Sequence, residues 1–457
     1  MNYNTNIEKI SRESAGIASQ KYNSLIDFTL LLDDADPNKG IVIPLNSLQK
    51  ITMDENIFSM LPTAKILLLD SGKFFDLYPL NIGRKIFINI YLKNKNDQNK
   101  KEPYITTRMT IQDVAISPDI TSSQIAYSIN CIYDCQSLFN SIMPYPYKDS
   151  ININIKESSV DVLRNIIQKI GMTFKSDIET NDSQYWINGT LNNKNFIDHI
   201  INHSFIKKED ATLMFTDING KCKYSSIKTL CNQPEKNSYI HTKKYNDLLK
   251  TASSEELNKK YPNTAIYGSI YNINPGALIT NEGGDKQSVS LYDPIDFIQD
   301  YDSFTFGDTL DLGTTFDKKY LKYNASVKKS YLASISNKEA SQLEKTNKTI
   351  NAGIHFPDMH ENYEISPAHN DNCKKSFFQT FFIMSLDMGK QLDSYYNLVS
   401  NLPRLGSLIY VDFNGETEHK TYTGRYLITR IQHVYTKGNS YSIAITCCSD
   451  GYYYIRK

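Results

Sequence analysis

Two histidines, His199 and His203, stand four residues apart in a segment with helical periodicity. That spacing places both imidazoles on one face of a helix, where such a pair can hold a metal ion. A metal site also needs further ligands, and the neighbouring Asp198 and Asn202 do not supply a convincing one. The pattern therefore favours solvated or packed histidines over a metal centre.

Other residues that could support catalysis or cofactor binding are sparse. His355 and His360 flank a Phe-Pro-Asp sequence in a polar loop, and Gly283-Gly284 fits a turn better than a phosphate cradle. The sequence contains no H-E-x-x-H, no G-x-S-x-G and no Walker loop. We expect no catalytic, metal-binding or cofactor-binding residues, no cofactor and no enzymatic activity.

The cysteines are odd in number and form no C-x-x-C pair. Their positions are Cys131, Cys135, Cys222, Cys231, Cys373, Cys447 and Cys448. A nucleophilic cysteine would need a partner histidine and an electropositive, exposed setting. The cysteines in β-rich runs fit better as small core residues, kept reduced in a cytoplasmic setting.

Composition excludes some classes of partner. Lys and Arg total 50 and Asp and Glu total 50, so no global field draws in nucleic acid or an anionic membrane. The basic residues are also spread out and form no stripe that would mark a nucleic-acid reader. No apolar run approaches the ~20 residues of a membrane helix, and the start lacks a signal pattern, which predicts a soluble protein not exported by a classical signal.

Two segments of the chain contain strand-like runs in the same order, and these elements would position any site. Gly83 to Cys131 and Gly406 to Cys447 each contain three β-branched and aromatic runs, which is typical of successive antiparallel strands. A proline precedes each first glycine, at Pro79 and Pro403. The glycine begins the first strand, where an unusual backbone angle or a close approach is expected.

Short identical runs support the comparison of the two segments. Ile111-Gln112-x-Val114 matches Ile431-Gln432-x-Val434, and Tyr127-Ser128-Ile129 matches Tyr441-Ser442-Ile443. An alternative is that any two β-meanders in a long chain look alike at this level. The shared order of the runs favours a repeat, and we expect both segments to adopt the same fold.

Periodicity divides the chain into three segments. Residues 1–149 are predicted to form a first β module, with Asp54-Glu55-Asn56 as a connection between two strands. Its strands before the repeat are expected at Leu25–Leu32, Gly40–Pro44, Leu48–Met53 and Ala64–Asp70. Residues 231–457 are predicted to form a second β module.

Residues 150–230 are expected to form an α/β insertion. Ser158-Ser159 can cap a helix that Gly171 ends, and Asn192 or Asn193 can cap a second helix. Ile218-Asn219-Gly220 then marks the turn of a hairpin. Because the helices are amphipathic, we expect them to need only each other and the hairpin to bury their apolar stripes.

Two parts of the second module are less regular. The polar run 318–372 is expected to be an excursion that packs weakly or orders only on assembly. The phenylalanines Phe377, Phe378, Phe381 and Phe382 favour a helix over a strand. The predicted class is α+β, mainly β, with two similar antiparallel β-barrel-like modules and a small α/β insertion domain.

This order of parts resembles the baseplate hub subunit of contractile-tailed bacteriophages and the related base of VgrG-type spike proteins. Three stretches carry the resemblance: Ile51 to Ser71, Phe196 to Gly220, and Asn401 to Val411 with its hairpin to Thr446. In that family three subunits close into a ring of six similar β modules, which joins a threefold spike to a sixfold tail tube.

The resemblance implies a structural virion protein of the tail baseplate, assembled in the host cytoplasm. It implies a homotrimer whose channel lets DNA pass without specific binding during genome ejection. The implied partners are the central spike, the tail tube, other baseplate wedge proteins and the tape-measure protein. Two alternatives stay open: the spike-base module of an injection or secretion apparatus, and a tail-associated wall-degrading enzyme.

Overall fold

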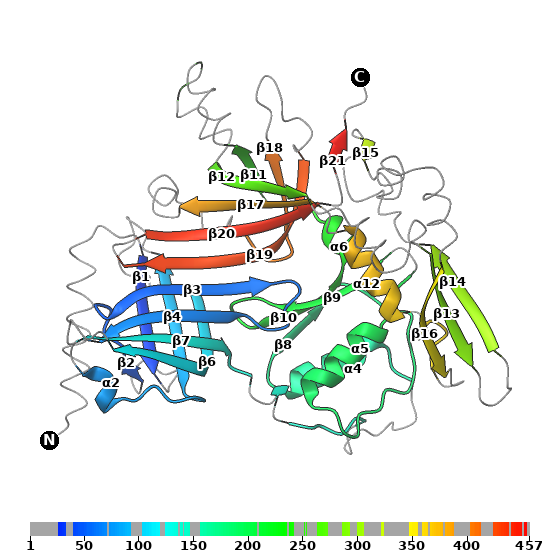
Figure 1. The fold of residues 1–457 in the computed structure, drawn as a ribbon, viewed down its shortest axis with the longest axis horizontal. Helices are drawn as coiled ribbons and strands as arrows, with labels where there is room; N and C mark the ends of the chain where they lie inside the picture. The colour runs from blue at the N-terminus through cyan, green and yellow to red at the C-terminus, as the bar shows by residue number, and fades with distance from the viewer. Residues whose placement is uncertain are drawn as a thin grey trace.

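The computed structural model of the chain describes residues 26–32, 40–70, 73–92, 103–118, 124–135, 138–139, 141–146, 156–207, 210–234, 237–241, 251, 253, 263–272, 286–292, 299–305, 321–323, 347–354, 359–363, 366–377, 380–387, 403–412, 424–437, 440–449 and 452–454. Within these residues the fold is mainly β, as the sequence predicts, and one large curled sheet dominates it (Figure 1). In the described part of the chain, no helix is long and apolar enough to cross a membrane.

The large sheet contains 13 strands from both ends of the chain. From the first third come β1 (Ile26–Leu32), β2 (Ile41–Val42), β3 (Leu48–Asn56), β4 (Thr63–Asp70), β5 (Lys85–Leu92), β6 (Pro103–Pro118) and β7 (Ile125–Tyr133). From the rest come β11 (Asn237–His241), β12 (Asn263–Asn272), β17 (Thr380–Asp387), β18 (Leu408–Asp412), β19 (Gly424–Thr436) and β20 (Ser440–Ser449). Their order is β18-β11-β12-β17-β20-β19-β3-β4-β7-β6-β5-β1-β2.

The later strands close on themselves, and the earlier ones do not. β18 pairs with β19 as well as with β11, so the path β19-β20-β17-β12-β11-β18 returns to β19. Among the described strands the first group ends instead at β2, which pairs with β1 over Leu31 and Leu32 alone. The two groups therefore differ in closure although they belong to one continuous sheet.

The two segments that resemble each other in sequence begin with the same turn. The amide of Gly83 donates to the carbonyl of Ile111 at 2.8 Å, and the amide of Gly406 donates to that of Ile428 at 3.0 Å. Both glycines have positive φ, 87° and 71°, which glycine adopts without steric cost. Gly83 is thus equivalent to Gly406, and Ile111 to Ile428.

The strands after these turns repeat the same register, including an irregularity. β6 pairs with β7 through Ile111↔Cys131 and shifts before Asp113↔Asn130. β19 pairs with β20 through Ile428↔Cys447 and shifts before Arg430↔Thr446. One β-bulge thus stands at the same place in each segment, and the prediction that Gly83–Cys131 and Gly406–Cys447 share a fold is confirmed at the level of strand order and register.

The match of short sequence runs is corrected by that register. Ile111 is equivalent to Ile428 and not to Ile431, and Tyr127 is equivalent to Ile443 and not to Tyr441. The identical runs mislead for two reasons. A displacement of two residues, as from Ile443 to Tyr441, keeps the alternation in phase. The displacement of three residues from Ile428 to Ile431 crosses the bulge, and both of these isoleucines are buried.

A compact α/β unit lies beside the sheet (Figure 1). It contains α4 (Ser159–Lys169), β8 (Thr173–Ser176), α5 (Asn193–His203), β9 (Thr212–Thr216), β10 (Lys221–Ser226) and α6 (Ile227–Cys231). Ser158 caps α4, Asn192 caps α5, and Gly171 after α4 has φ of 84°, so both predicted helices are confirmed with their caps. β9 and β10 form the predicted hairpin around Ile218-Asn219-Gly220.

Buried side chains form two clusters, and the hairpin takes part in both. The larger cluster belongs to the sheet and includes Phe215, Ile218 and Leu230 of the α/β unit. The smaller lies around α4 and α5 and includes Tyr363 from a distant part of the chain. The expectation that the helices need only each other and the hairpin is therefore wrong.

The polar run 318–372 and the phenylalanines after it differ from expectation. Its described end is packed against the α/β unit, with His360, Ser366, His369 and Asn370 buried, so the prediction of weak packing is wrong there. Helix α12 (Ser366–Phe377) ends at Phe377, and Phe381 and Phe382 lie in β17, which pairs with β12 on one side and β20 on the other. Sheet pairing outweighed the helical spacing of these residues.

The remaining elements are short or lie apart from the large sheet. They are α2 (Phe74–Leu77), β13 (Lys286–Tyr292), β14 (Gln299–Thr305), β15 (Leu321–Tyr323), β16 (Asn347–Ile354) and β21 (Tyr452–Tyr454). β14, β13 and β16 form their own sheet, and β15 pairs with β21. His355 and Gly283-Gly284 lie outside the described residues. The division into domains at 149/150 and 230/231 stays a prediction.

Candidate assembly interface

One long strand, β19, joins the two groups of strands. The first part of its edge, Gly424 to Leu427, pairs with β18, and the second part, Arg430 to Thr436, pairs with β3. The change of partner occurs at the bulge, where the carbonyl of Thr429 accepts from the amide of Ile57 at 2.9 Å. A bulge increases local twist, so it can turn one edge from one partner to another.

An ion pair crosses the junction between β19 and β3. The guanidinium of Arg430 donates to both carboxylate oxygens of Asp54, through Nε at 2.6 Å and Nη2 at 2.8 Å. These hydrogen bonds raise the pKa of Arg430, although partial burial opposes them. A two-point contact of this kind fixes orientation as well as adding attraction, so it holds β3 and β19 in register.

A buried carboxylate connects the α/β unit to the same junction. Glu55, 4% exposed, accepts a hydrogen bond at Oε2 from the amide of Ile218 at 2.8 Å. Its Oε1 lies 3.6 Å from Nε2 of His433 on β19. Burial raises the pKa of the adjacent Asp217, and the Coulombic effect of Glu55 adds to the rise. One carboxylate thus contacts the sheet junction and the tip of the hairpin.

Sequence reasoning missed these residues because it placed Asp54-Glu55-Asn56 in a connection. The structure extends β3 through Asn56, which corrects that expectation. The signal was the alternation itself, since Ile51, Met53, Glu55 and Ile57 are all buried at every second position. A glutamate at an inward position of such an alternating run does not have to end the strand. Here Glu55 makes a polar contact from within β3.

The histidine pair considered as a metal site lies in an aromatic cluster. The rings of His199 and His203 are 4.6 Å apart, and His203 stacks on Tyr363 at 4.0 Å. Nε2 of His199 lies 3.0 Å from the Tyr363 hydroxyl, and Nδ1 of His203 lies 3.0 Å from the Tyr363 carbonyl. Nε2 of His360 lies 2.8 Å from the His203 carbonyl. These contacts join α5 to the segment 359–363.

The electrostatics of this cluster favour neutral imidazoles. Burial lowers the pKa of His203 to about 4, against an opposing effect of its hydrogen bond to Tyr363. Burial also lowers the pKa of His199. Among the described residues, no group of three or more His, Cys, Asp or Glu side chains is arranged to hold a metal ion.

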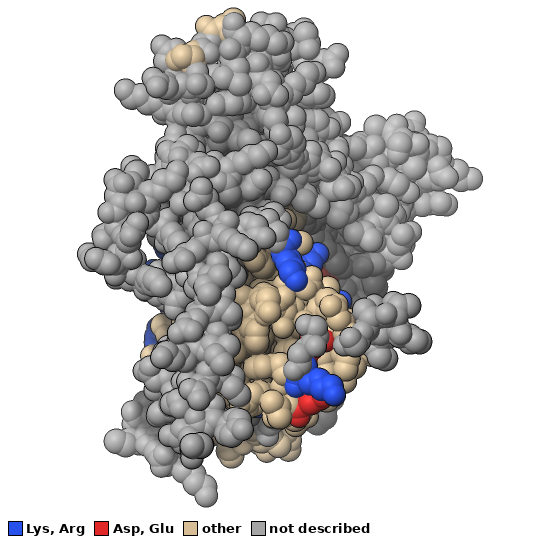
Figure 2. Space-filling model, turned by 90° about the vertical axis from the view of Figure 1, so that its left-hand side faces the viewer, with Lys and Arg blue, Asp and Glu red and all other residues tan. Residues whose placement is uncertain are grey.

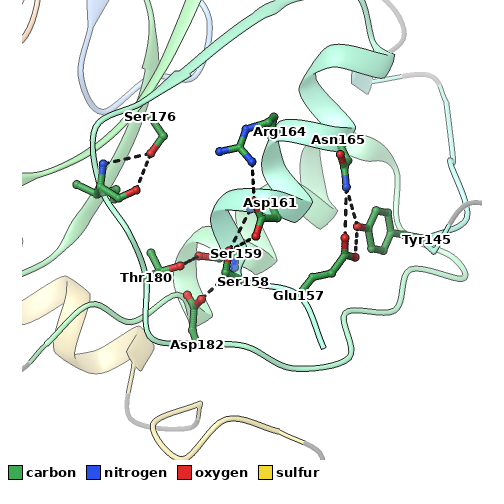
Figure 3. Close-up of polar contacts among 11 residues, drawn as sticks. Tyr145, Glu157, Ser158, Ser159, Asp161, Arg164, Asn165, Ser176, Thr180 and Asp182 are labelled. Atoms are coloured by element: carbon green, nitrogen blue, oxygen red, sulfur yellow. Dashed lines mark hydrogen bonds and ion pairs between the residues drawn. The ribbon is translucent and has the colours of Figure 1, made fainter. Parts of the chain in front are cut away.

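Polar contacts at the start of α4 hold the α/β unit together (Figure 3). The buried Asp182 accepts from the amide of Ser159 at 2.9 Å and from the amide of Phe205 at 3.0 Å. The hydroxyl of Tyr145 contacts the carboxylate of Glu157. Each carboxylate is used by neighbouring groups of the fold, which makes this network a structural one.

The cysteines with described surroundings are buried and free of disulfide bonds, as expected for core residues. They are Cys131, Cys135, Cys222, Cys231, Cys447 and Cys448. Burial raises the pKa of Cys131 and Cys222 to about 12, so both thiols are protonated at neutral pH and are poor nucleophiles.

Comparison with known proteins gives structural matches only. No family model and no curated protein matches the sequence. The crystal structure of the tail protein from Neisseria meningitidis MC58 is 8% identical, with a TM-score of 0.52, covering 93% of this chain and 98% of that one. The 43 kDa tail protein of prophage MuSo2 from Shewanella oneidensis is 10% identical, with a TM-score of 0.50, covering 92% and 98%.

A third similarity is weaker. The lidded PdpA–VgrG complex of Francisella is 11% identical, with a TM-score of 0.44, over 98% of this chain and 56% of that one. A score this low supports no conclusion. The first two matches, which span nearly the full length of both chains, confirm at the level of the fold the resemblance to phage tail proteins that the sequence predicts.

Proposed function

We propose that this protein is a structural subunit of a phage tail baseplate hub. Three copies would close into a ring, with two similar β modules each, and would join a sixfold tail tube to a threefold spike. The proposed modules are residues 1–149 and 231–457, with 150–230 as an insertion on the outside. The channel of the ring would let DNA pass during ejection.

The observation that carries this proposal is the repeated register within one sheet. β5-β6-β7 and β18-β19-β20 share strand order, a glycine turn and the position of a bulge. Two like units in one chain provide the means for three chains to present six like surfaces. The fold shared with two tail proteins supports the same function.

Charge also supports a role in protein assembly. Figure 2 shows the end of the molecule that carries α2, and its described surface is mostly uncharged, with Lys and Arg and some Asp and Glu near the margins. The exposed apolar side chains of Leu77 and Ile82 belong to α2 and the turn after it. A surface of this kind suits contact with another protein better than retention of a polyanion.

Light scattering of the purified chain tests the proposal, alone and mixed with the tail proteins encoded beside it. The expected result is the mass of a trimer in at least one of these conditions. A stable dimer, or a monomer that ignores every tail component, would contradict the hub function. Release of fragments from peptidoglycan by the isolated chain would instead support the wall-degrading alternative.

A further inference from the structure

The strands β6 and β19 are equivalent from Thr107 and Gly424 to Pro118 and Tyr435. Each is long, each pairs first with the strand that follows a glycine turn, and each carries the bulge at the same place. Beyond the bulge, β19 pairs with β3 from Arg430 to Thr436. The corresponding part of β6, Asp113 to Pro118, has no partner on that edge among the described strands.

The strand equivalent to β3 in the later group is β12. β3 meets β4 through Ile51↔Ile66, and β4 meets β7 through Ile66↔Ile129. In the same way β12 meets β17 through Gly268↔Met384, and β17 meets β20 through Met384↔Ile445. Since Ile129 and Ile445 are equivalent in the repeated register, Gly268 takes the place of Ile51.

β12 also has an edge without a partner in the described structure. β11 pairs with it only at Asn263 and Ile266. The part from Tyr267 to Asn272 pairs with β17 on one edge, and no described strand lies on the other. Among the described residues, the chain therefore has two strand edges without a partner strand, and they are of the same kinds as the two edges that pair at the β19–β3 junction.

Burial differs between the equivalent residues in the way a missing partner predicts. His433 on β19 is 3% exposed, whereas its counterpart on β6, Ile116, is 61% exposed. Ile431 is fully buried, and its counterpart Val114 is half-buried. An apolar side chain on an exposed strand edge is a hazard that proteins ordinarily avoid unless a partner covers it.

We propose that β6 of one copy pairs antiparallel with β12 of a second copy, repeating between chains the junction that β19 and β3 make within one. The register carried over from that junction opposes Val114 to Asn272, Ile116 to Ile270 and Ser117 to Ser269. This proposal rests on the proposed hub function and identifies the contact that closes its ring.

The contact is head-to-tail, because each copy offers one β6 edge and one β12 edge. A head-to-tail contact gives a closed ring when its rotation matches the symmetry and an open fibre when it does not. If the junction between chains repeats the internal one, successive junctions around the ring are equal. The sheet then continues from chain to chain, and neither edge stays open.

A disulfide trap tests the register. Within the chain, Lys437 donates to Gln49 at 2.7 Å and Ile57 donates to Thr429, which makes Val434↔Thr52 a pair without mutual hydrogen bonds. Such pairs hold their side chains closest and suit a disulfide. Ser117 and Ser269 are the equivalent pair, so the full-length double variant Ser117→Cys with Ser269→Cys should form covalent dimers and closed trimers on oxidation.

The matched control is Ser117→Cys with Ile270→Cys, since adjacent strand residues point to opposite faces. It should stay free of crosslinks, as should each single variant and the unmodified chain. A trimer by light scattering without the Ser117–Ser269 crosslink would overturn the strand pairing and leave the hub function standing. Failure to form any trimer would overturn both.

A second pair of variants separates backbone pairing from side-chain packing. By the same parity, the amide of Ile116 points to the open edge, so Ile116→Pro removes a donor needed by the second copy and none used by β7. Ile116→Ser keeps that amide. We expect the proline variant to remain a folded monomer and the serine variant to form the trimer. Trimers in both variants would contradict the proposal.

Discussion

At the scale of single residues, the junction between β3 and β19 depends on polar groups whose partners are far away in the sequence. The guanidinium of Arg430 donates to both carboxylate oxygens of Asp54, and the amide of Ile218 donates to the carboxylate of Glu55. A buried carboxylate is costly unless its oxygens accept hydrogen bonds. The contacts of Glu55 therefore explain why a charged residue is tolerated at an inward position of a strand.

Removing the acceptor at Glu55 should weaken the docking of the hairpin. In Glu55→Ala the buried amide of Ile218 loses its partner, which should cost about 1–3 kcal/mol in the free energy of unfolding. Glu55→Gln keeps a carbonyl oxygen that can accept, so its loss should be clearly smaller. Urea unfolding of both variants measures this. Equal losses would show that the charge matters and the hydrogen bond does not.

At the scale of elements, the helix α5 and two described parts of the later sequence, residues 359–363 and helix α12, stabilise each other although more than 150 residues separate them. His203 and Tyr363 stack, and the side-chain amide of Asn370 donates to the Asn202 carbonyl at 3.2 Å. Amphipathic helices bury their stripes against whatever apolar surface the fold provides. Here that surface comes partly from residues 359–363 and α12, which belong to a polar part of the sequence with little helical periodicity.

This docking should weaken in acid because of His203. The folded chain lowers the pKa of His203 to about 4, whereas the unfolded chain binds the proton near pH 6.5. The contribution of neutral His203 is therefore fully present above about pH 6.5 and is lost as the pH falls toward 4. The variant His203→Gln cannot titrate, so its stability should depend less on pH.

Chemical unfolding of both proteins between pH 7 and pH 4.5 checks this expectation. The difference between their stabilities should shrink by on the order of 1–3 kcal/mol across that range. His199 titrates in the same direction in both proteins and serves as an internal constant. Parallel pH profiles would show that His203 is not the group that responds.

At the scale of the whole molecule, one sheet runs through both ends of the chain and the charges balance. Lys and Arg total 50, and Asp and Glu total 50. Affinity for DNA comes largely from phosphate neutralisation, which a balanced surface provides poorly. This composition is consistent with the proposed ring, which would let DNA pass without binding it.

We therefore expect no measurable binding of duplex DNA at about 0.15 M salt. Fluorescence anisotropy with a labelled duplex, using a basic DNA-binding protein as the positive control, measures this directly. A dissociation constant in the micromolar range that rises steeply with salt would contradict the expectation. It would point to a local basic surface that composition conceals.

The sequence by itself determined the elements whose cause is local. The caps at Ser158 and Asn192, the turn at Ile218-Asn219-Gly220 and the glycines that begin both repeated segments follow from backbone geometry within a few residues. The mainly β class and the repeat also came from local alternation. Each of these depends on neighbours that the sequence places side by side.

Tertiary structure decided what depends on distant partners. It set the register of the repeat, because Ile428 and Ile431 lie on either side of a β-bulge and are both buried, and the sequence alone does not show where the bulge lies. It placed Phe381 and Phe382 in β17 between two strands, and it gave Glu55 and Arg430 partners that no spacing predicts. Strand pairing and burial act between segments that are far apart in the sequence, and they outweigh weak local preferences. A short window of sequence contains only one of the two partners, so it cannot predict them.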